Sequence, residues 1–243
     1  MNWRRHPRQV HCCEVTSRAQ PQPGGEPIAA EALPIVLRPA REPDFHQDRA
    51  RRSYVALLDA ATALFSARGY DAVGTPEIAQ RAGVSVGTFY RYFEDKHEIY
   101  LEIARRTFAA GYRQTLADLG PERFAGRARH ETISATIAIL FDHVLSQPEL
   151  MRSFREMSLR DARVAELQRA FEQIAVARIA DLIAALVGRD IVPDPEATAW
   201  VVHASVVETA YGLAGHCGMP PISSERARRA LTDIIERAIF WKT

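Results

Sequence analysis

Residues 75–96 read TPEIAQRAGVSVGTFYRYFEDK, and this stretch decides the fold. Gly83, Val84 and Ser85 separate two short runs of residues that suit helices. Ser85 is a natural N-cap, because its side-chain oxygen can accept a hydrogen bond from an N–H group in the next helix. Two short helices joined by a tight glycine-containing turn form a helix-turn-helix, whose second helix enters the major groove of DNA. The pattern therefore predicts a candidate recognition helix over residues 86–93.

The helix before this turn has two possible starts. Thr75 as N-cap would place Pro76 at the first helical position, where its missing N–H costs nothing. Gly74 as N-cap would place Glu77 at the third position, facing the positive end of the helix. Both arrangements remain open at this point, and each ends the helix near Gly83.

A longer helix is predicted upstream, over residues 53–67, with Ser53 as its cap and Gly69 as its stop. The apolar side chains that share one face of it are Tyr54, Leu58, Ala61 and Phe65. Downstream, Asp95 caps a long fourth helix that extends to about Gly111. Its inward side chains are predicted to be Ile99, Ile103 and Phe108.

The rest of the chain also has helical patterning, and no segment alternates as a strand does. Helices are predicted near residues 125–146, 148–157, 161–187, 195–216 and 223–241, with glycine and proline between them. The fold class is therefore all-α. We expect a three-helix DNA-binding domain over residues 49–96 and a larger helical domain over residues 97–243.

Residues 1–48 contain many prolines and no helical or strand period, so they are predicted to form a disordered arm. A tail without a role is the simpler interpretation, and an arginine-containing arm that touches DNA or a partner is the alternative. A true start codon downstream of Met1 is a third possibility. The first ten residues lack the apolar core of a secretory signal.

The net charge, the cysteine content and the length of the apolar runs limit the possible functions further. The chain has 243 residues with a formal net charge of +1, so any DNA binding must come from locally placed groups. Cys12, Cys13 and Cys217 have neither zinc spacing nor the number needed for a disulfide framework. No apolar run reaches the length that spans a membrane. A cytoplasmic protein is expected, located at the nucleoid when bound to DNA, with no membrane partner, metal or cofactor.

Three runs carry a resemblance to a known family: Phe65-Ser-Ala-Arg-Gly-Tyr70, Ile78-Ala-Gln-Arg-Ala-Gly-Val-Ser85 and Gly87-Thr-Phe-Tyr-Arg-Tyr-Phe93, followed by Lys96. Together they resemble the N-terminal domain of TetR-family repressors over about residues 53–101. The resemblance implies phosphate contacts by Thr75, Thr88, Tyr90, Tyr92 and Lys96. It implies base-facing positions at Val86, Gly87 and Arg91, and core positions at Phe89 and Phe93.

Several details of this motif narrow the base contacts. Arg91 is the side chain here that can contact guanine through two hydrogen bonds. Val86 stands where the family often has a polar or basic residue or proline, so contact there is expected to be apolar. Gly74 stands where threonine is common, and Pro76 removes a frequent contact side chain. DNA shape is therefore expected to contribute to sequence recognition.

The same resemblance implies that the second half dimerises and binds a small molecule. The helices predicted over residues 197–214 and 226–240 are interpreted as strongly amphipathic and long enough to form a four-helix bundle with a second copy. The alternative is that their apolar faces close the core of a single chain. A homodimer through these last two helices fits an operator with two half-sites.

Aromatic, methionine and histidine side chains are candidate ligand contacts, because they suit a mostly apolar pocket with a few polar groups. They are Phe108, His143, Met151, Phe154, Met157, Phe171, Trp200, His203 and Tyr211. Each one is also a plausible core residue. An apolar or amphipathic effector is expected.

The expected function is transcriptional repression, relieved when an effector shifts the fourth helix and changes the separation of the two recognition helices. A transcriptional activator and an effector-independent DNA-binding protein share every feature described above and remain alternatives. Asp142 and His143 suggest acid–base chemistry, but adjacent helical residues point about 100° apart and form no site by themselves. No nucleophile elbow or glycine-rich phosphate loop occurs, so no enzymatic activity is expected.

Overall fold

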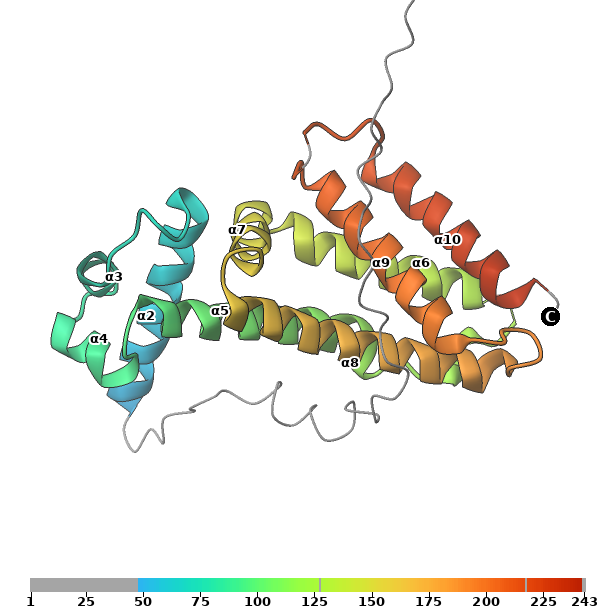
Figure 1. Cartoon of the computed structure of the whole chain (residues 1–243), viewed down its shortest axis with the longest axis horizontal. Coiled ribbons are helices and arrows are strands. Elements are labelled where there is room, and N and C mark those ends of the chain that lie inside the picture. The colour runs from blue at the N-terminus through green and yellow to red at the C-terminus, as the bar shows by residue number, and fades with distance from the viewer. Residues whose placement is uncertain (1–47, 127, 217, 242–243) are drawn as a thin grey trace, which may run out of the picture.

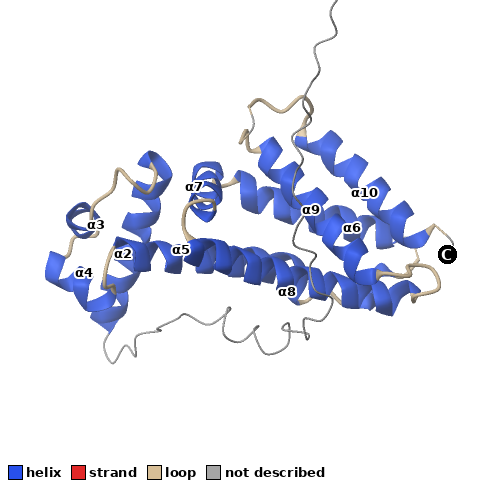
Figure 2. Ribbon diagram, viewed as in Figure 1, coloured by secondary structure: helices blue, strands red, loops and turns tan. Residues whose placement is uncertain are grey.

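The computed structural model describes residues 48–126, 128–216 and 218–241, and every regular element within them is a helix (Figures 1 and 2). This confirms the all-α prediction. The predicted N-terminal arm lies outside the described residues, apart from Asp48 at its end. None of the helices in the described segments combines the length and apolar character needed to cross a bilayer.

Three helices form the N-terminal unit: α2 (Asp48–Arg68), α3 (Thr75–Arg81) and α4 (Val86–Tyr92). The predicted cap Ser53 is wrong, because α2 begins upstream of it. The Ser53 hydroxyl instead donates to the Arg49 carbonyl within the helix at 3.1 Å. Gly69 ends α2 as predicted, with φ of 74°, a conformation that glycine adopts without strain.

The caps around the turn explain how α3 and α4 are placed. Gly74 is the N-cap of α3, which selects one of the two arrangements open from the sequence and puts Pro76 within the first turn. Ser85 accepts a hydrogen bond from the Thr88 backbone N–H at 3.1 Å, and Asp95 accepts one from Glu98 at 2.8 Å. The predicted caps of α4 and the following helix are therefore confirmed.

The larger part of the molecule follows from Lys96 onward. Its helices are α5 (Lys96–Tyr112), α6 (Ala128–Leu145), α7 (Pro148–Ser158), α8 (Ala162–Val187), α9 (Pro195–Leu213) and α10 (Ser224–Phe240). A π-helical turn, η1 (Arg113–Ala117), extends α5, and a 3₁₀ turn, η2 (Pro121–Phe124), precedes α6. These two turns were not predicted.

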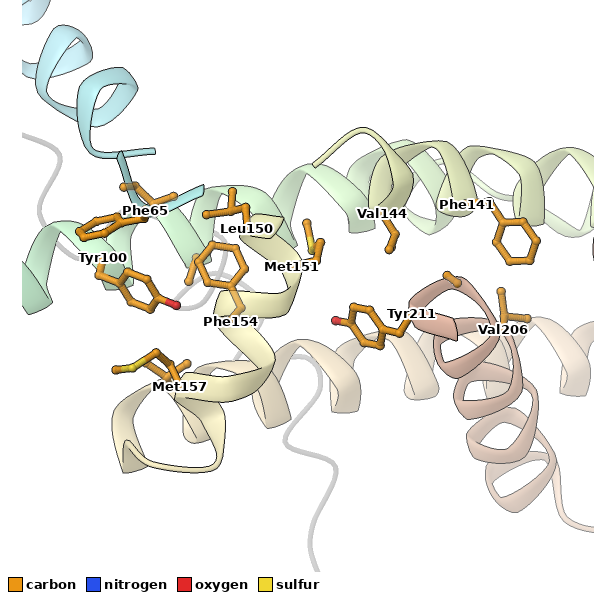
Figure 3. Close-up of a cluster of buried hydrophobic side chains, with 14 of the residues drawn as sticks. Phe65, Tyr100, Phe141, Val144, Leu150, Met151, Phe154, Met157, Val206 and Tyr211 are labelled. Atoms are coloured by element: carbon orange, nitrogen blue, oxygen red, sulfur yellow. The ribbon is translucent and has the colours of Figure 1, made fainter. Parts of the chain in front are cut away.

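The helix α5 leads from the N-terminal unit into the rest of the molecule and runs beside α8, while α6, α9 and α10 pack beyond it (Figure 1). One buried core continues across the junction. Phe65 of α2 contacts Tyr100 of α5 with ring centroids 5.2 Å apart, and Tyr100 contacts Phe154 of α7 at 5.4 Å (Figure 3). Such aromatic packing makes the two parts mechanically continuous.

The interpretation of both C-terminal helices as amphipathic holds only for α10. In α9, apolar side chains occur around the whole circumference: Ala199 and Val206 are buried, whereas Trp200 and Val201 are more than half exposed. A helix that is apolar on all sides is expected to be covered on all sides. The exposed side of α9 therefore requires a functional explanation.

Candidate DNA-binding surface and ligand cavity

The helix α4 is held by one face and presents the other to solvent. Phe89 is fully buried and Phe93 nearly so, as predicted for the core of the motif. Val86, Gly87 and Arg91 are exposed. These are the three predicted base-facing positions, and the structure brings them together at the outer surface of one short helix.

Two hydroxyl pairs order the polar rim of this surface. The Tyr90 hydroxyl lies 3.1 Å from the Thr75 Oγ1, which joins α4 to the first turn of α3. The Thr88 Oγ1 lies 2.8 Å from the Ser85 Oγ at the start of α4. Tyr90 is 54% exposed, so its ring stands at the surface with its hydroxyl available for exchange with another acceptor.

Arg91 lies against its neighbour on the chain. Its Nη2 donates to the Tyr92 hydroxyl at 3.2 Å, and its guanidinium is 5.2 Å from the centre of the Tyr92 ring. The Tyr92 hydroxyl donates in turn to the Ala50 carbonyl in α2 at 3.1 Å. This contact engages one nitrogen of the guanidinium and holds the Arg91 side chain beside the Tyr92 ring.

Lys96 also faces the protein. Its Nζ donates to the Tyr70 carbonyl at 2.9 Å and stands 4.2 Å from the centre of the Tyr70 ring. This contact fixes the start of α5 against the loop after α2, and a cation over an aromatic face is attractive. The sequence placed Lys96 at a helix start but held no sign of this packing, which depends on a residue 26 positions away.

A buried carboxylate, which was not singled out in the sequence, joins α5 to α2. Glu102 accepts from Arg105 Nε at 2.8 Å, from Arg106 Nε at 2.6 Å and from the Tyr54 hydroxyl at 3.3 Å. Burial acts to raise the pKa of Glu102, but the hydrogen bonds from the two arginines outweigh it and the pKa is lowered. Burial and the nearby carboxylate raise the pKa of Tyr54 to about 12.

A cavity of about 620 Å³ lies in the larger part of the molecule, walled by α5, α6, α7, α8, α9 and α10. Its volume suits a small organic ligand. The predicted ligand residues on its wall are Phe108, His143, Met151, Phe171, Trp200, His203 and Tyr211. They come from five different helices, so only the tertiary structure assembles them.

Phe154 and Met157 do not reach the cavity. Both are buried, and Phe154 packs with Tyr100 and with Phe108 at ring centroid distances of 5.4 and 5.5 Å. Phe154 occupies the side of α7 that faces α5, whereas Met151 lines the cavity together with Tyr211 (Figure 3). Much of the wall that sequence reasoning missed is aliphatic, including Ile137, Leu140, Ile179, Leu182 and Leu186.

The two histidines of the wall are held neutral at pH 7. Burial lowers the pKa of His143, opposed in part by a hydrogen bond with the Thr107 backbone. Burial also lowers the pKa of His203, opposed by the nearby carboxylate of Glu172. His143 packs directly on Gly111 of α5, where an added Cβ would lie 3.1 Å from the ring Nε2. Glycine at this position allows α5 and α6 to approach closely.

Further contacts link the cavity side of the molecule to the first turns of α5. The Tyr100 hydroxyl lies 2.8 Å from the Ser153 Oγ in α7. His97 Nε2 lies 3.0 Å from a carboxylate oxygen of Asp161, the N-cap of α8. Hydrogen bonding of Asp161 to the Val164 backbone and to His97 lowers its pKa, against the opposing effect of desolvation. The start of α5 is therefore tied to both α7 and α8.

Part of the chain matches a known protein family. Residues 57–103 match the family described as bacterial regulatory proteins, tetR family. The activator FasR of Mycolicibacterium smegmatis is 36% identical over 36% of this chain and 38% of its own length. The repressor KstR of Rhodococcus jostii is 39% identical over 28% of this chain and 32% of its own length. These alignments thus span about a third of each relative.

The fold is shared over a longer range. A TetR-family regulator from Mesorhizobium loti superposes with a TM-score of 0.60 at 23% identity, covering 79% of this chain and 97% of that one. The matched sequence segment contains α3 and α4 with the exposed positions described above, and the superposition extends to the larger helical part. Residues 57–103 thus match the family described as bacterial regulatory proteins, tetR family, and the chain shares its fold with a TetR-family regulator over 79% of its length.

Proposed function

We propose that this chain is a DNA-binding transcription regulator that leaves its operator when a small molecule fills the cavity. The observation that carries the proposal is that one helix serves both sites. The helix α5 begins four residues after α4 ends, and its far end supplies Phe108, Gly111 and Tyr112 to the cavity wall. A ligand that moves these residues acts on the helix that supports α4.

The DNA side of the proposal assigns two roles to the exposed surface of α4. Val86, Gly87 and Arg91 face the bases. The hydroxyl groups of Thr75, Thr88, Tyr90 and Tyr92 and the ammonium group of Lys96 contact phosphates. Without DNA, Arg91 contacts Tyr92 and Lys96 contacts the Tyr70 carbonyl. On DNA, Arg91 exchanges its contact for one with guanine, and Lys96 exchanges its contact for one with a phosphate.

A homodimer through α9 and α10 provides the two-fold symmetry for two half-sites. Val201 in α9 is 55% exposed and Ile234 in α10 is 63% exposed. Exposed apolar side chains on two adjacent helices favour burial against a second copy of the same pair. The two recognition helices of such a dimer would address a palindromic operator.

Repression with release by an effector is the direction we propose, as in the name of the relative KstR. Activation is the second candidate, favoured by the name of FasR, which matches over a longer segment. The structural features are common to both. The coupling is reciprocal in either case, because an effector that lowers operator affinity must itself bind more weakly to the DNA-bound protein.

Selection of bound fragments from genomic DNA, followed by anisotropy titrations of the chosen operator, tests this function. We expect a palindromic site bound by a dimer, with affinity reduced by a compound that occupies the cavity. A reporter placed behind that operator should rise when the gene is deleted if the protein represses, and fall if it activates. Absence of sequence-selective binding would refute the proposal, and lack of response to any cavity-binding compound would favour an effector-independent protein.

A further inference from the structure

The cavity wall carries an unbalanced negative charge. Its ionisable groups with formal charge at pH 7 are Arg155, Glu172 and Glu208. Arg155 Nη2 donates to Glu208 Oε2 at 2.9 Å, so these two charges largely offset each other. Among the described residues, Glu172 has a hydrogen bond from the Trp200 indole Nε1 at 3.1 Å and no cation within ion-pair distance.

The other polar groups do not supply the missing positive charge. His143 and His203 are kept neutral because burial lowers the pKa of each ring. The indole N–H of Trp200 is a neutral donor and only partly compensates a carboxylate. The Glu172 carboxylate is partly exposed at the cavity wall, so a ligand that covers it would leave its charge uncompensated unless the ligand supplies a cation.

Aromatic rings of the same cavity wall suit a cation as well. Trp200 of α9 contacts Glu172, and Phe108 and Phe171 line the cavity with their ring centroids 5.7 Å apart. Ring faces attract cations, and the attraction grows when water is excluded. The aliphatic wall at Ile179 and other residues of α6, α8 and α10 offers a place for a hydrocarbon body.

We propose that the cavity takes an apolar organic cation and that Glu172 selects its positive charge. The inference rests on the proposed function only in treating the cavity as the effector site. A carboxylate ligand with the same hydrocarbon body would be repelled by Glu172 and would compete with Glu208 for Arg155. A neutral ligand would leave the Glu172 carboxylate without a counter-charge.

Three probes of equal chain length test the charge preference: decyltrimethylammonium, 1-decanol and decanoate. Their dissociation constants are measured by calorimetry on the full chain at pH 7, below the concentration at which each probe aggregates. We expect decyltrimethylammonium to bind about tenfold more tightly than decanol, which corresponds to one ion pair of modest strength. Decanoate is expected to bind most weakly.

The substitution Glu172→Gln keeps the size and the hydrogen bond to Trp200 while removing the charge. It should weaken decyltrimethylammonium binding by about tenfold, leave decanol unchanged and strengthen decanoate binding. Glu166→Gln is the matched control, because Glu166 is an exposed residue of the same helix that does not line the cavity. It should change none of the three constants.

The outcomes separate this inference from the proposed function. Tightest binding of decanoate, binding of none of the probes, or an unchanged charge preference in Glu172→Gln would each overturn the inference. Operator titration with decyltrimethylammonium bound is read separately. If the cation binds through Glu172 but does not change operator affinity, the charge selection stands and effector-controlled DNA release is refuted for this ligand class.

Discussion

Arg160 and Asp71 join the turn between α7 and α8 to the loop between α2 and α3. Arg160 Nη2 lies 2.9 Å from Asp71 Oδ2 and 3.1 Å from Oδ1, although the residues are 89 positions apart in the chain. The neighbours Ser158 and Leu159 line the cavity. This ion pair therefore connects the cavity wall to the helix-turn-helix by a route that does not pass through α5.

We expect the Arg160–Asp71 ion pair to couple effector binding in the cavity to operator binding by the helix-turn-helix. Both side chains are more than half exposed, so the contact contributes little to stability. We expect Asp71→Asn to leave folding and apo operator affinity nearly unchanged while reducing the effector-induced loss of operator affinity several-fold. Anisotropy titrations with and without an effector identified by operator release measure this. Asp118→Asn, in an exposed position away from the turn, is the control, and an equal effector response in both variants would exclude a role in coupling.

Arg91→Ala should relax base discrimination at one operator position by about 1–3 kcal/mol. The reason is that Arg91 is the side chain of α4 able to form two hydrogen bonds with guanine. Titration against operators substituted at each position measures the change. Tyr92→Phe is a useful companion, because it removes the hydroxyl that Arg91 contacts in the absence of DNA. Full discrimination retained by Arg91→Ala would contradict the assignment.

Lys96→Gln distinguishes a phosphate contact from a purely structural one. If Lys96 leaves the Tyr70 carbonyl to bind phosphate, the substitution should weaken binding to all sequences alike. It should also reduce the slope of log affinity against log salt concentration by about one. If its contact with Tyr70 is its whole role, the melting temperature should fall and the slope should not change.

Glu102→Ala should destabilise the protein by about 3 kcal/mol, because it removes a buried carboxylate that accepts hydrogen bonds from Arg105 and Arg106. The free energy of unfolding in denaturant measures this change. Glu98→Ala, which removes a carboxylate from the first turn of the same helix, serves as the comparison.

Acid should have a related effect on the wild-type protein. The folded pKa of Glu102 lies below its usual value of 4.5, so the unfolded chain binds this proton more readily than the folded chain. The stability that Glu102 contributes is present above pH 4.5 and is lost as pH falls through its folded pKa. Glu102→Gln should flatten the fall in stability over this range, and an identical acid profile in both proteins would exclude the effect.

Local chemistry in the sequence was enough to predict the helix-turn-helix. Ser85 and Asp95 cap helices through atoms three residues away, and Gly69 ends α2 through its own backbone conformation. The family resemblance implied core positions for Phe89 and Phe93, and both side chains are buried. Ser53 failed as a cap because α2 begins at Asp48.

Packing between distant parts of the chain determines where the candidate functional side chains lie. Arg91 and Lys96 have the residue types of DNA contacts, but their neighbours Tyr92 and Tyr70 determine where their side chains lie without DNA. Phe108 reaches the cavity while Phe154 closes the core behind it, although both are aromatic residues of amphipathic helices.

The helix-turn-helix and the helical character of the chain thus follow from residues that interact within a few positions of one another. The cavity, the charge at Glu172 and the contact between Arg160 and Asp71 depend on how distant helices pack, because each unites atoms that periodicity and capping do not relate.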